Sequence, residues 1–499
     1  MRQALRIFRK DVRHLWPHAA VVVFLAAVYA CMDAALPGNP MMEGAEAACG
    51  LLLWVAACIL AIAAVHEDPL TGDRQFWITR PYSWKSLLLA KALFILVFVN
   101  LPVLLGQLAA LAANGRSPLD YLPRLVLHQM AFAVWVLAPA AVLAAVTANL
   151  VQAVLTVLAG AVGWYIIVVL LVGAGAGDAL APGSAAPVVE TCKAAIAILC
   201  AAGICALQYA RRATYLARRL VVCGVLAPTA FQIALPWGAA FALIARQPPP
   251  DAAAIHLWRD PARDPQTWLR GVSPWTHQDI VAISVPIQVA GIPSGLEAYS
   301  DHVLVTVEGP GGERWSSGWS PGSEVWNETR PTFGDQKLLP GDGGPYTLLF
   351  TADRSFCRRF CAGPVHLRAA VAFVLLGTPR TTRLTPGNRP QRIPGDGFCY
   401  PQKPGNVRCY APLQKVEESV IRYRSLETGA VMDEHVGGTA LASNYWPNVF
   451  SVWEDLSLGI WWARTPPVPV AVFFETRQAV ARFERVLDTP DVRLAELRQ

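Results

Sequence analysis

The triplet His66-Glu67-Asp68 holds the side chains best suited to bind a metal ion or to transfer a proton. Both kinds of chemistry need side chains that converge on one point. Three consecutive residues point in different directions on a helix or a strand. We therefore interpret the triplet as the polar end of a helix, and we expect no metal site.

The sequence also lacks the short motifs that carry common catalytic chemistry. It has no GxxxxGK[ST] loop for nucleotide phosphates and no HExxH metal motif. The chain is therefore not predicted to be an enzyme.

Cysteine is the remaining residue type that could do chemistry. Seven of the 11 cysteines lie in or beside apolar segments, where a thiol behaves as a small hydrophobic group. The other four are Cys357, Cys361, Cys399 and Cys409. An even number outside the cytoplasm indicates disulfides, and the local pairs 357–361 and 399–409 are the favoured two of the possible pairings. The alternative, a metal site of four thiolates, needs tighter CxxC spacing.

A polar connector that spans residues 67–85 contains more aromatic residues than a solvated loop needs. Its large apolar side chains are Phe76, Trp77, Ile78, Tyr82 and Trp84. Aromatic residues supply much of the binding energy at protein interfaces, so the connector could dock into a partner. They also form belts at membrane surfaces, and the residues alone leave both interpretations open.

Composition divides the chain into two regions. Overall, 54% of the residues are hydrophobic and only 16% are charged, whereas globular domains are nearer one quarter charged. Residues 1–247 carry 17 Lys and Arg against 10 Asp and Glu, and the remainder carries 25 against 26. This predicts a membrane region followed by a soluble domain at 251–499. The basic residues of the first region flank apolar segments, so no nucleic acid partner is expected.

Seven apolar segments approach the length of about 20 residues that a helix needs to cross a bilayer. They lie near residues 18–36, 47–66, 87–113, 125–147, 150–174, 189–208 and 220–245, within a membrane domain at 17–247. The first is interpreted as an uncleaved span rather than a signal peptide. Before it, residues 1–16 place Leu5, Phe8, Val12 and Leu15 on one stripe, which predicts an amphipathic helix in the membrane interface.

The distribution of Lys and Arg predicts the orientation. With the N-terminus inside, the inner segments hold most of the basic residues, whereas the outer connectors 37–46 and 175–188 hold none. The 67–85 connector is then cytoplasmic, and seven spans place the region after Gln247 outside. No carboxylate lies in the middle of a span, so any active transport must take its energy from another protein.

The second region reads as antiparallel β structure. Alternating apolar runs at 280–285, 302–307, 346–350 and 365–374 are separated by turn signals rich in Gly and Pro. This pattern predicts a mostly β, sandwich-like exterior domain. The sequence after Thr476 fits either a strand or a helix.

Three stretches of the connector and the following span resemble a known signature. They are Glu67-Asp68-Pro69, Phe76-Trp77-Ile78-Thr79-Arg80-Pro81 and Leu87-Leu88-Leu89-Ala90-Lys91. They resemble permease subunits of type-2 ATP-binding-cassette (ABC) exporters. In that family an acidic residue closes the second span, a short helix with Arg-Pro follows, and Ala-Lys lies near the start of the third span. The resemblance covers residues 1 to about 210.

The resemblance implies a permease subunit in the bacterial cytoplasmic membrane, paired with a second copy or a paralogue. The connector would be the coupling helix that docks on a cytoplasmic ATPase subunit, which would hold ATP and Mg²⁺; this chain would bind no cofactor. Residues 1–16 would be the family's interfacial connecting helix. The ATPase-coupling residues would be Glu67, Arg74, Phe76, Trp77, Ile78, Arg80, Pro81, Tyr82 and Lys91.

The chain departs from the family pattern in its seventh span and in its large exterior domain. These departures leave the substrate open. A non-transporting membrane sensor with an exterior β receptor domain is the alternative, and a membrane-embedded enzyme is a third option that lacks a catalytic constellation.

Overall fold

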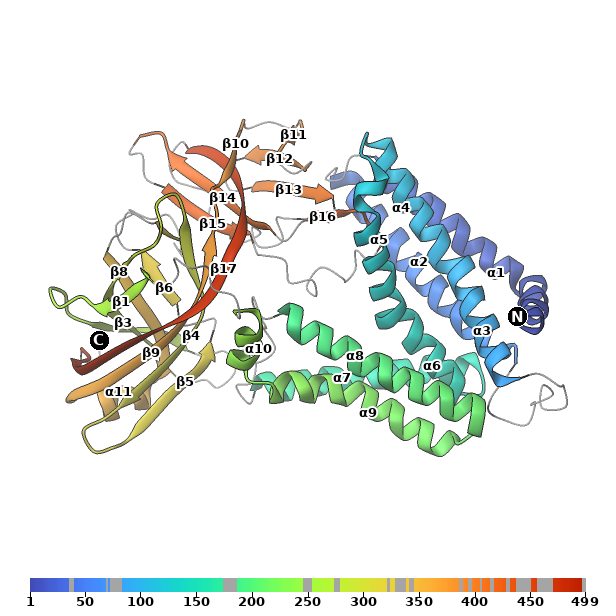
Figure 1. The fold of residues 1–499 in the computed structure, drawn as a ribbon, viewed down its shortest axis with the longest axis horizontal. Coiled ribbons are helices and arrows are strands. Elements are labelled where there is room, and N and C mark those ends of the chain that lie inside the picture. Colours follow the sequence, from blue (N-terminus) through green and yellow to red (C-terminus); the bar gives the residue numbers. More distant parts are fainter. Residues whose placement is uncertain are drawn as a thin grey trace. The chain divides into compact units, whose positions relative to one another are not determined.

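The computed structural model describes most of the chain. The described residues are 1–35, 40–68, 71, 83–173, 186–245, 254–272, 279–320, 324–327, 338–340, 345–385, 389–393, 397–403, 406–412, 417–427, 431–436, 450–455 and 470–495. They form two compact units (Figure 1). The helical unit contains 1–169, 189–234 and 441–454, and the β unit contains 170–188, 235–440 and 455–499.

The helices of the first region follow one another with short breaks. They are α1 (Arg2–Ala34), α2 (Pro40–His66), α3 (Trp84–Ile95), α4 (Leu101–Ala113), α5 (Pro118–Phe132), α6 (Ala138–Val146), α7 (Leu150–Gly173), α8 (Ala186–Ala206), α9 (Thr214–Ala234) and α10 (Trp237–Ile244). Short π-helical segments, η2 (Leu96–Asn100) and η3 (Ala133–Leu137), join α3 to α4 and α5 to α6, and η6 (Leu207–Arg211) follows α8.

Six helical segments of the described chain are long and apolar enough to cross a membrane. They are Arg2–Ala34, Gly44–His66, Trp84–Ala113, Pro118–Val146, Leu150–Ile167 and Val188–Arg211. Each of the six overlaps one of the first six expected spans. A multi-pass membrane protein is therefore indicated, as its composition suggested.

The expected seventh span at 220–245 is not one continuous helix. The chain breaks at Leu235-Pro236, between α9 and α10, because proline has no N–H for the helix ladder and restricts the residue before it. Only if the two helices are taken together does the pair count as a seventh candidate. Helix α10 belongs to the β unit, where Trp237 stacks on His302 with the ring centres 4.1 Å apart.

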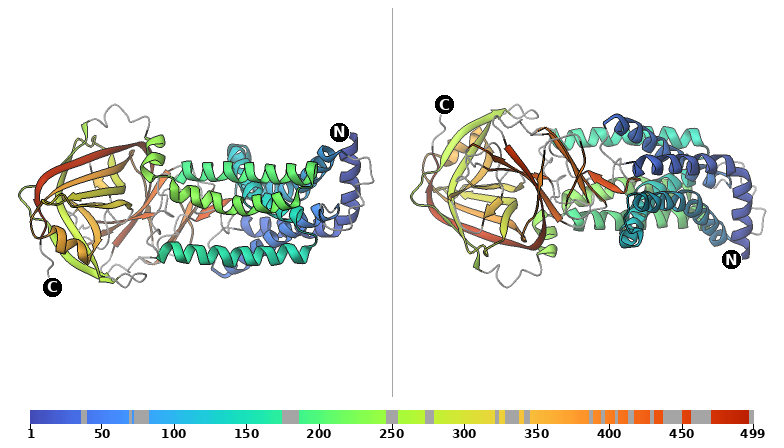
Figure 2. Two further views of the ribbon diagram at one scale, coloured as in Figure 1. Left: turned by 90° about the horizontal axis from the view of Figure 1, so that it is seen from below. Right: turned by 90° about the horizontal axis from the view of Figure 1, so that it is seen from above.

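The expected interfacial helix and first span form a single helix, α1, which passes through Pro17. Figure 2 shows the first turns of α1 running across the direction of its remainder. The buried stripe of these first turns is Ala4, Ile7, Asp11 and Leu15. The stripe is offset from the expected one, and it carries a carboxylate in place of an apolar residue.

The strands of the second region are connected mainly by turns. They are β1 (His256–Arg259), β2 (Gln266–Val272), β3 (Asp279–Ala290), β4 (Glu297–Glu308), β5 (Arg314–Ser320), β6 (Glu324–Asn327), β7 (Leu338–Pro340), β8 (Pro345–Asp353), β9 (Pro364–Leu376), β10 (Arg380–Leu384), β11 (Gln391–Arg392), β12 (Phe398–Lys403), β13 (Asn406–Pro412), β14 (Glu417–Ser425), β15 (Val431–Val436), β16 (Trp453–Asp455) and β17 (Val470–Arg493). A short helix, α11 (Arg354–Phe360), lies between β8 and β9.

Two antiparallel sheets share one hydrophobic core in the β unit. The smaller sheet has the order β1-β3-β8-β6, with β2 beside β3. The larger sheet has the order β15-β14-β17-β9-β4-β5, with β10 beside β17 and β7 beside β4. Alternate residues of β3, such as Val281 and Ile283, pack in the same cluster as Val305 of β4 and Phe373 of β9. The expected β architecture is thus present, and all four expected strands occur in β3, β4, β8 and β9.

The compact units differ from the expected domains in three places. Residues 170–188, expected within the membrane domain, belong to the β unit. The main part of the β unit begins at Leu235 rather than near residue 251, because α10 packs on its strands. Residues 441–454 belong to the helical unit although they follow most of the strands in sequence. The last part of the chain, which the sequence left open, is the long strand β17.

Candidate functional site

The structure describes only the two ends of the aromatic connector. Helix α2 ends at His66, and Glu67, Asp68 and Thr71 follow it. Residues Arg74, Phe76, Trp77, Ile78, Arg80, Pro81 and Tyr82 lie outside the described residues. On the far side of the connector, Ser83 begins α3 as its N-cap, and its hydroxyl accepts a hydrogen bond from the backbone N–H of Ser86 at 3.2 Å.

A buried cluster of four charged side chains lies where these two ends meet α1. The ammonium nitrogen of Lys91, on α3, is 2.8 Å from Oδ2 of Asp11 and 2.8 Å from Oδ2 of Asp68. Lys10 reaches Oδ1 of Asp68 at 2.8 Å and lies 3.5 Å from Oδ1 of Asp11. We call these four residues the Lys91 cluster. It links α1 and α3 to Asp68, two residues after the end of α2.

Three of the four side chains in the Lys91 cluster are deeply buried. The side chains of Asp11, Lys91 and Asp68 are 0%, 3% and 6% exposed, whereas that of Lys10 is 27% exposed. Two carboxylates and two ammonium groups balance in charge, so each ion is compensated after it leaves water. Burial by itself would raise the pKa of Asp68, but the positive charges of Lys91 and Lys10 outweigh it and lower that pKa.

The two residues that the resemblance singled out in this region do not pair with each other. Lys91 binds Asp68, whereas Glu67 turns to the other side and lies 3.3 Å from Nδ1 of His14 on α1. The short sequence Glu67-Asp68 therefore contacts α1 through both of its carboxylates. Consecutive residues point in different directions, and here both directions meet the same helix.

Apolar packing surrounds the Lys91 cluster and fixes α1 against the third span. The ring of Phe8 contacts those of Phe94 and Phe98, with centres 6.3 and 6.1 Å apart. The cluster itself offers no chemistry beyond ionic contact, since both carboxylates already bind ammonium groups. Over the described ranges no group of His, Cys, Asp and Glu could hold a metal ion. The arrangement can transmit force between helices, but it has no free nucleophile or base.

A second polar site lies at the far end of α1, around the buried side chain of Asp33. Its carboxylate accepts hydrogen bonds from the hydroxyl of Ser451 at 2.6 Å and from the backbone N–H of Val452 at 3.0 Å. The indole N–H of Trp453 donates to the backbone oxygen of Asp33 at 3.0 Å. A segment more than 400 positions away in sequence is thus bound to the end of the first span.

A chain of side-chain amides leads from the interior of the helical unit to this segment. Asn100, at the end of η2, donates to the side-chain oxygen of Gln129 at 3.1 Å. Gln129 donates to Gln107 at 2.9 Å, and Gln107 donates to the backbone oxygen of Phe450 at 3.2 Å. All three amides are buried, so their pairing satisfies groups that would otherwise be costly in an apolar interior.

Sequence reasoning considered Glu67, Asp68 and Lys91 but missed the pairing of Asp68 with Lys91, and it missed Asp11 and the three amides. The signal for Asp11 was present, since it follows Ile7 and precedes Leu15 by four residues each. On a helix this spacing places all three side chains on one face. The amides interrupt apolar runs, and Asn100 and Gln107 are seven positions apart, which again corresponds to one face.

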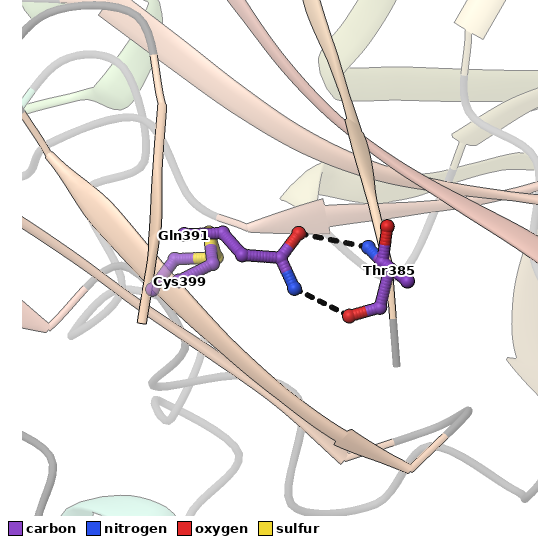
Figure 3. Close-up of a disulfide and its surroundings, with 4 residues drawn as sticks. Thr385, Gln391 and Cys399 are labelled. Atoms are coloured by element: carbon purple, nitrogen blue, oxygen red, sulfur yellow. Dashed lines mark hydrogen bonds between the residues drawn. A yellow bond between two sulfur atoms is a disulfide. The ribbon is translucent and has the colours of Figure 1, made fainter. Parts of the chain in front are cut away.

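The structure joins Cys399 to Cys409 in a disulfide across the paired strands β12 and β13. This is one of the two favoured pairings. Figure 3 shows the neighbouring side-chain amide of Gln391 bound to the backbone of Thr385, whose N–H donates to Oε1 at 2.8 Å. The amide N–H of Gln391 donates in turn to the backbone oxygen of Thr385.

The other favoured pairing, between Cys357 and Cys361, is not formed in the structure, because neither residue takes part in a disulfide. Cys357 lies in α11 and Cys361 caps its end. Side chains four positions apart on a helix have Cβ atoms about 5–6 Å apart, whereas a disulfide needs about 3.5–4.5 Å. A hydrogen bond between the two thiols lowers the pKa of Cys357, and burial opposes that shift.

Comparison with known proteins gives no match to a family model, to a curated protein or to a solved structure. The functional argument therefore rests on the residues and on the geometry described above.

Proposed function

We propose that this protein is a permease subunit of an ATP-driven ABC transporter, with export as the direction of transport. The observation that carries the proposal is the Lys91 cluster. Its four charges connect α1, the beginning of the 67–85 connector and α3 within hydrogen-bonding distance. A force applied to the connector would therefore reach the first and third spans directly, which a coupling element requires.

In the proposed mechanism, a separate cytoplasmic ATPase binds the connector. Phe76, Trp77 and Tyr82 serve as apolar anchors, and Arg74 and Arg80 meet carboxylates on the ATPase. Closure of the ATPase pair on binding ATP and Mg²⁺ moves the connector. Asp68 and Lys91 pass that movement to the spans on either side of it, and Asp11 extends it to α1. A conformational change of this kind needs contacts that differ between two states, and the ATPase supplies that difference.

The topology of the proposal follows from the basic residues. Arg74, Arg80 and Lys85 place the connector on the cytoplasmic side, together with the basic residues of the first turns of α1. The Asp33 site then faces the exterior. If α9 crosses the membrane as the seventh span, the β unit is exterior too, and the disulfide between Cys399 and Cys409 fits such an oxidising compartment.

The proposed partners besides the ATPase are lipid and a second permease subunit, identical or paralogous. Helix α7 exposes a run of large apolar side chains: Val151, Leu155, Leu158 and Val162. Such a surface fits either the hydrocarbon of a bilayer or another apolar helix.

Purification from the native membrane tests the proposal. The full-length protein, extracted in mild detergent, should bring with it an ATPase that contains a phosphate-binding loop. Trp77→Ala and Arg80→Glu should lower the recovered ATPase at least tenfold at unchanged permease levels. Arg314→Glu, on the exposed strand β5, is the matched control and should have no effect. If the recovered ATPase and its ATP hydrolysis were unchanged by both connector variants, the coupling role would be wrong.

A membrane sensor is the second candidate, and the Asp33 site favours it. A receptor needs a physical link between its exterior part and its spans, and residues 450–453 supply such a link to α1. The same purification discriminates between the two, because a sensor should bring with it a kinase or a transcription regulator in place of an ATPase.

A further inference from the structure

The segment from Phe450 to Trp453 is bound to the helical unit much as a short peptide is bound to a receptor. All four residues are buried, at 2%, 5%, 0% and 3% exposed. Within the segment the backbone N–H of Trp453 donates to the hydroxyl of Ser451 at 3.0 Å. Three other donors, the Ser451 hydroxyl, the Val452 N–H and the Trp453 indole, converge on Asp33. Recognition of this kind uses main-chain hydrogen bonds for affinity and side-chain pockets for specificity.

Phe450 supplies the apolar part of the recognition. Its ring meets Tyr29 of α1 and Phe132 of α5 edge to face, with centres 5.8 and 5.2 Å apart. Its backbone oxygen accepts the hydrogen bond from Gln107 of α4 at 3.2 Å. Three helices thus contribute to one site, and a small cavity lined by Ala26, Ala30, Leu53, Val103 and Gly106 remains beside the ring.

The charge of the site defines what it can bind. Across the described part of the chain, Asp33 forms no ion pair, and its carboxylate is compensated by the donors of the segment. The hydroxyl of Tyr29 donates to a second acid, Glu46, at 3.3 Å. Two acidic groups repel anionic ligands, and they select a ligand that offers N–H and O–H donors. A buried ionisable residue in an apolar helix of this kind marks a candidate functional site.

We propose that the Asp33 site is a peptide-binding site and that Phe450–Trp453 is its resident, tethered occupant. Its ligands are short peptides in which an aromatic residue is followed by a hydroxyl-bearing residue and then by a residue whose backbone N–H can donate to the carboxylate, as Val452 does. The resident segment competes at the high effective concentration of a tethered ligand, on the order of millimolar. External peptide therefore enters only when the segment has left. This inference does not depend on the ATPase.

A peptide of residues 448–455, labelled with a fluorophore at its N-terminus, tests the site. The full-length protein in lipid nanodiscs is compared with the variant Phe450→Ala/Trp453→Ala, whose own segment binds poorly. The variant should bind the peptide saturably at about 1–100 µM, and the unmodified protein should bind it at least tenfold more weakly. A scrambled peptide is the control and should bind neither protein.

Asp33→Asn in the same variant should weaken peptide binding at least about tenfold, because the carboxylate is the main acceptor. An unfolding temperature equal to that of the unmodified protein shows that a variant is folded. A folded variant that does not bind the peptide, or that binds it equally well after Asp33→Asn has removed the acid, would overturn the proposal.

A milder substitution keeps the test independent of folding defects. Ser451→Cys preserves size, and the buried thiol should react slowly with a water-soluble maleimide, followed at that residue by peptide mass spectrometry. Adding Asp33→Asn should raise that rate at least about tenfold, since an acceptor of the segment is weakened. An equal rate in both variants would show that Asp33 does not hold the segment, and the proposal would fail.

Discussion

Replacing Lys91 with methionine should destabilise the helical unit strongly. Methionine has nearly the same length and fits the apolar surroundings of α3, so packing changes little. The change leaves Asp11 and Asp68 facing each other with 0% and 6% exposure, and only the partly exposed Lys10 remains to compensate them. Removing one partner from a buried ion pair costs about 3–5 kcal/mol, because the other partner keeps an uncompensated charge. We expect a loss of this size.

The measurement is unfolding of the full-length protein by SDS in mild detergent micelles, followed by far-UV circular dichroism. Lys85→Met is the matched control, because Lys85 lies on the same helix, is exposed and, among the described residues, contacts Trp84 through a cation–π interaction. Exposed pairs contribute about 0–1 kcal/mol, so the control should change stability by no more than that.

A second substitution separates charge from packing. Lys91→Met combined with Asp11→Asn leaves Asp68 paired with Lys10, so the remaining charges balance again. This double variant should recover more than half of the stability lost by Lys91→Met alone. If Lys91→Met costs no more than Lys85→Met, or if the two substitutions are simply additive, the Lys91 cluster does not hold the spans together in the way described.

Three further predictions concern the β unit. The pKa of Asp353 is lowered by hydrogen bonds from the side chain of Ser355 and the start of α11, so its carboxylate stabilises the fold above its ordinary pKa of 3.8. Asp353→Ala should therefore cost about 1 kcal/mol at neutral pH, and the difference should fade as an acid titration of the unfolding midpoint falls below pH 3.8. Gly291→Ala should cost at least about 2 kcal/mol in urea unfolding, because φ is +85° and the new Cβ would clash with the backbone oxygen of Ala254. Gly295→Ala, at φ +81° with nothing nearer than 4.0 Å, should cost only about 1 kcal/mol. Loss of the 399–409 disulfide should cost about 3 kcal/mol, and both cysteines should resist alkylation until reductant is added.

The sequence predicted the elements well because they depend on local periodicity. The first six apolar segments are helices because a run of about 20 apolar residues has few other stable arrangements. In the strands at 280–285 and 365–374, apolar residues either alternate with polar ones or form an unbroken run between turn signals. Both strands contribute residues to the hydrophobic core, as expected. The expected seventh span is broken at Leu235-Pro236, because the proline interrupts an apolar run that hydropathy alone treats as continuous.

The candidate site was only half visible in the sequence because it is made by contacts between distant residues. Lys91 was noticed through a motif, but its partner Asp11 lies 80 positions away, on the buried side of a helix taken to be interfacial. Asp33 lies near the end of an expected span, where a charged side chain can reach water and needs no special partner. No periodicity within α1 could indicate that Ser451 and Val452 would bind it. Pairing across such distances is a property of the fold and not of any window of sequence.

The contact between Asp33 and Val452 also sets an order of events during biosynthesis. The two residues are 419 positions apart, and synthesis at about 5–20 residues per second separates them by about 20–80 s. During that interval the carboxylate of Asp33 lacks the hydrogen bonds that this segment donates. The helical unit is thus completed by a segment made more than 400 residues after its first helix, and a chain that stops before residue 450 keeps an open acidic site at the end of that helix.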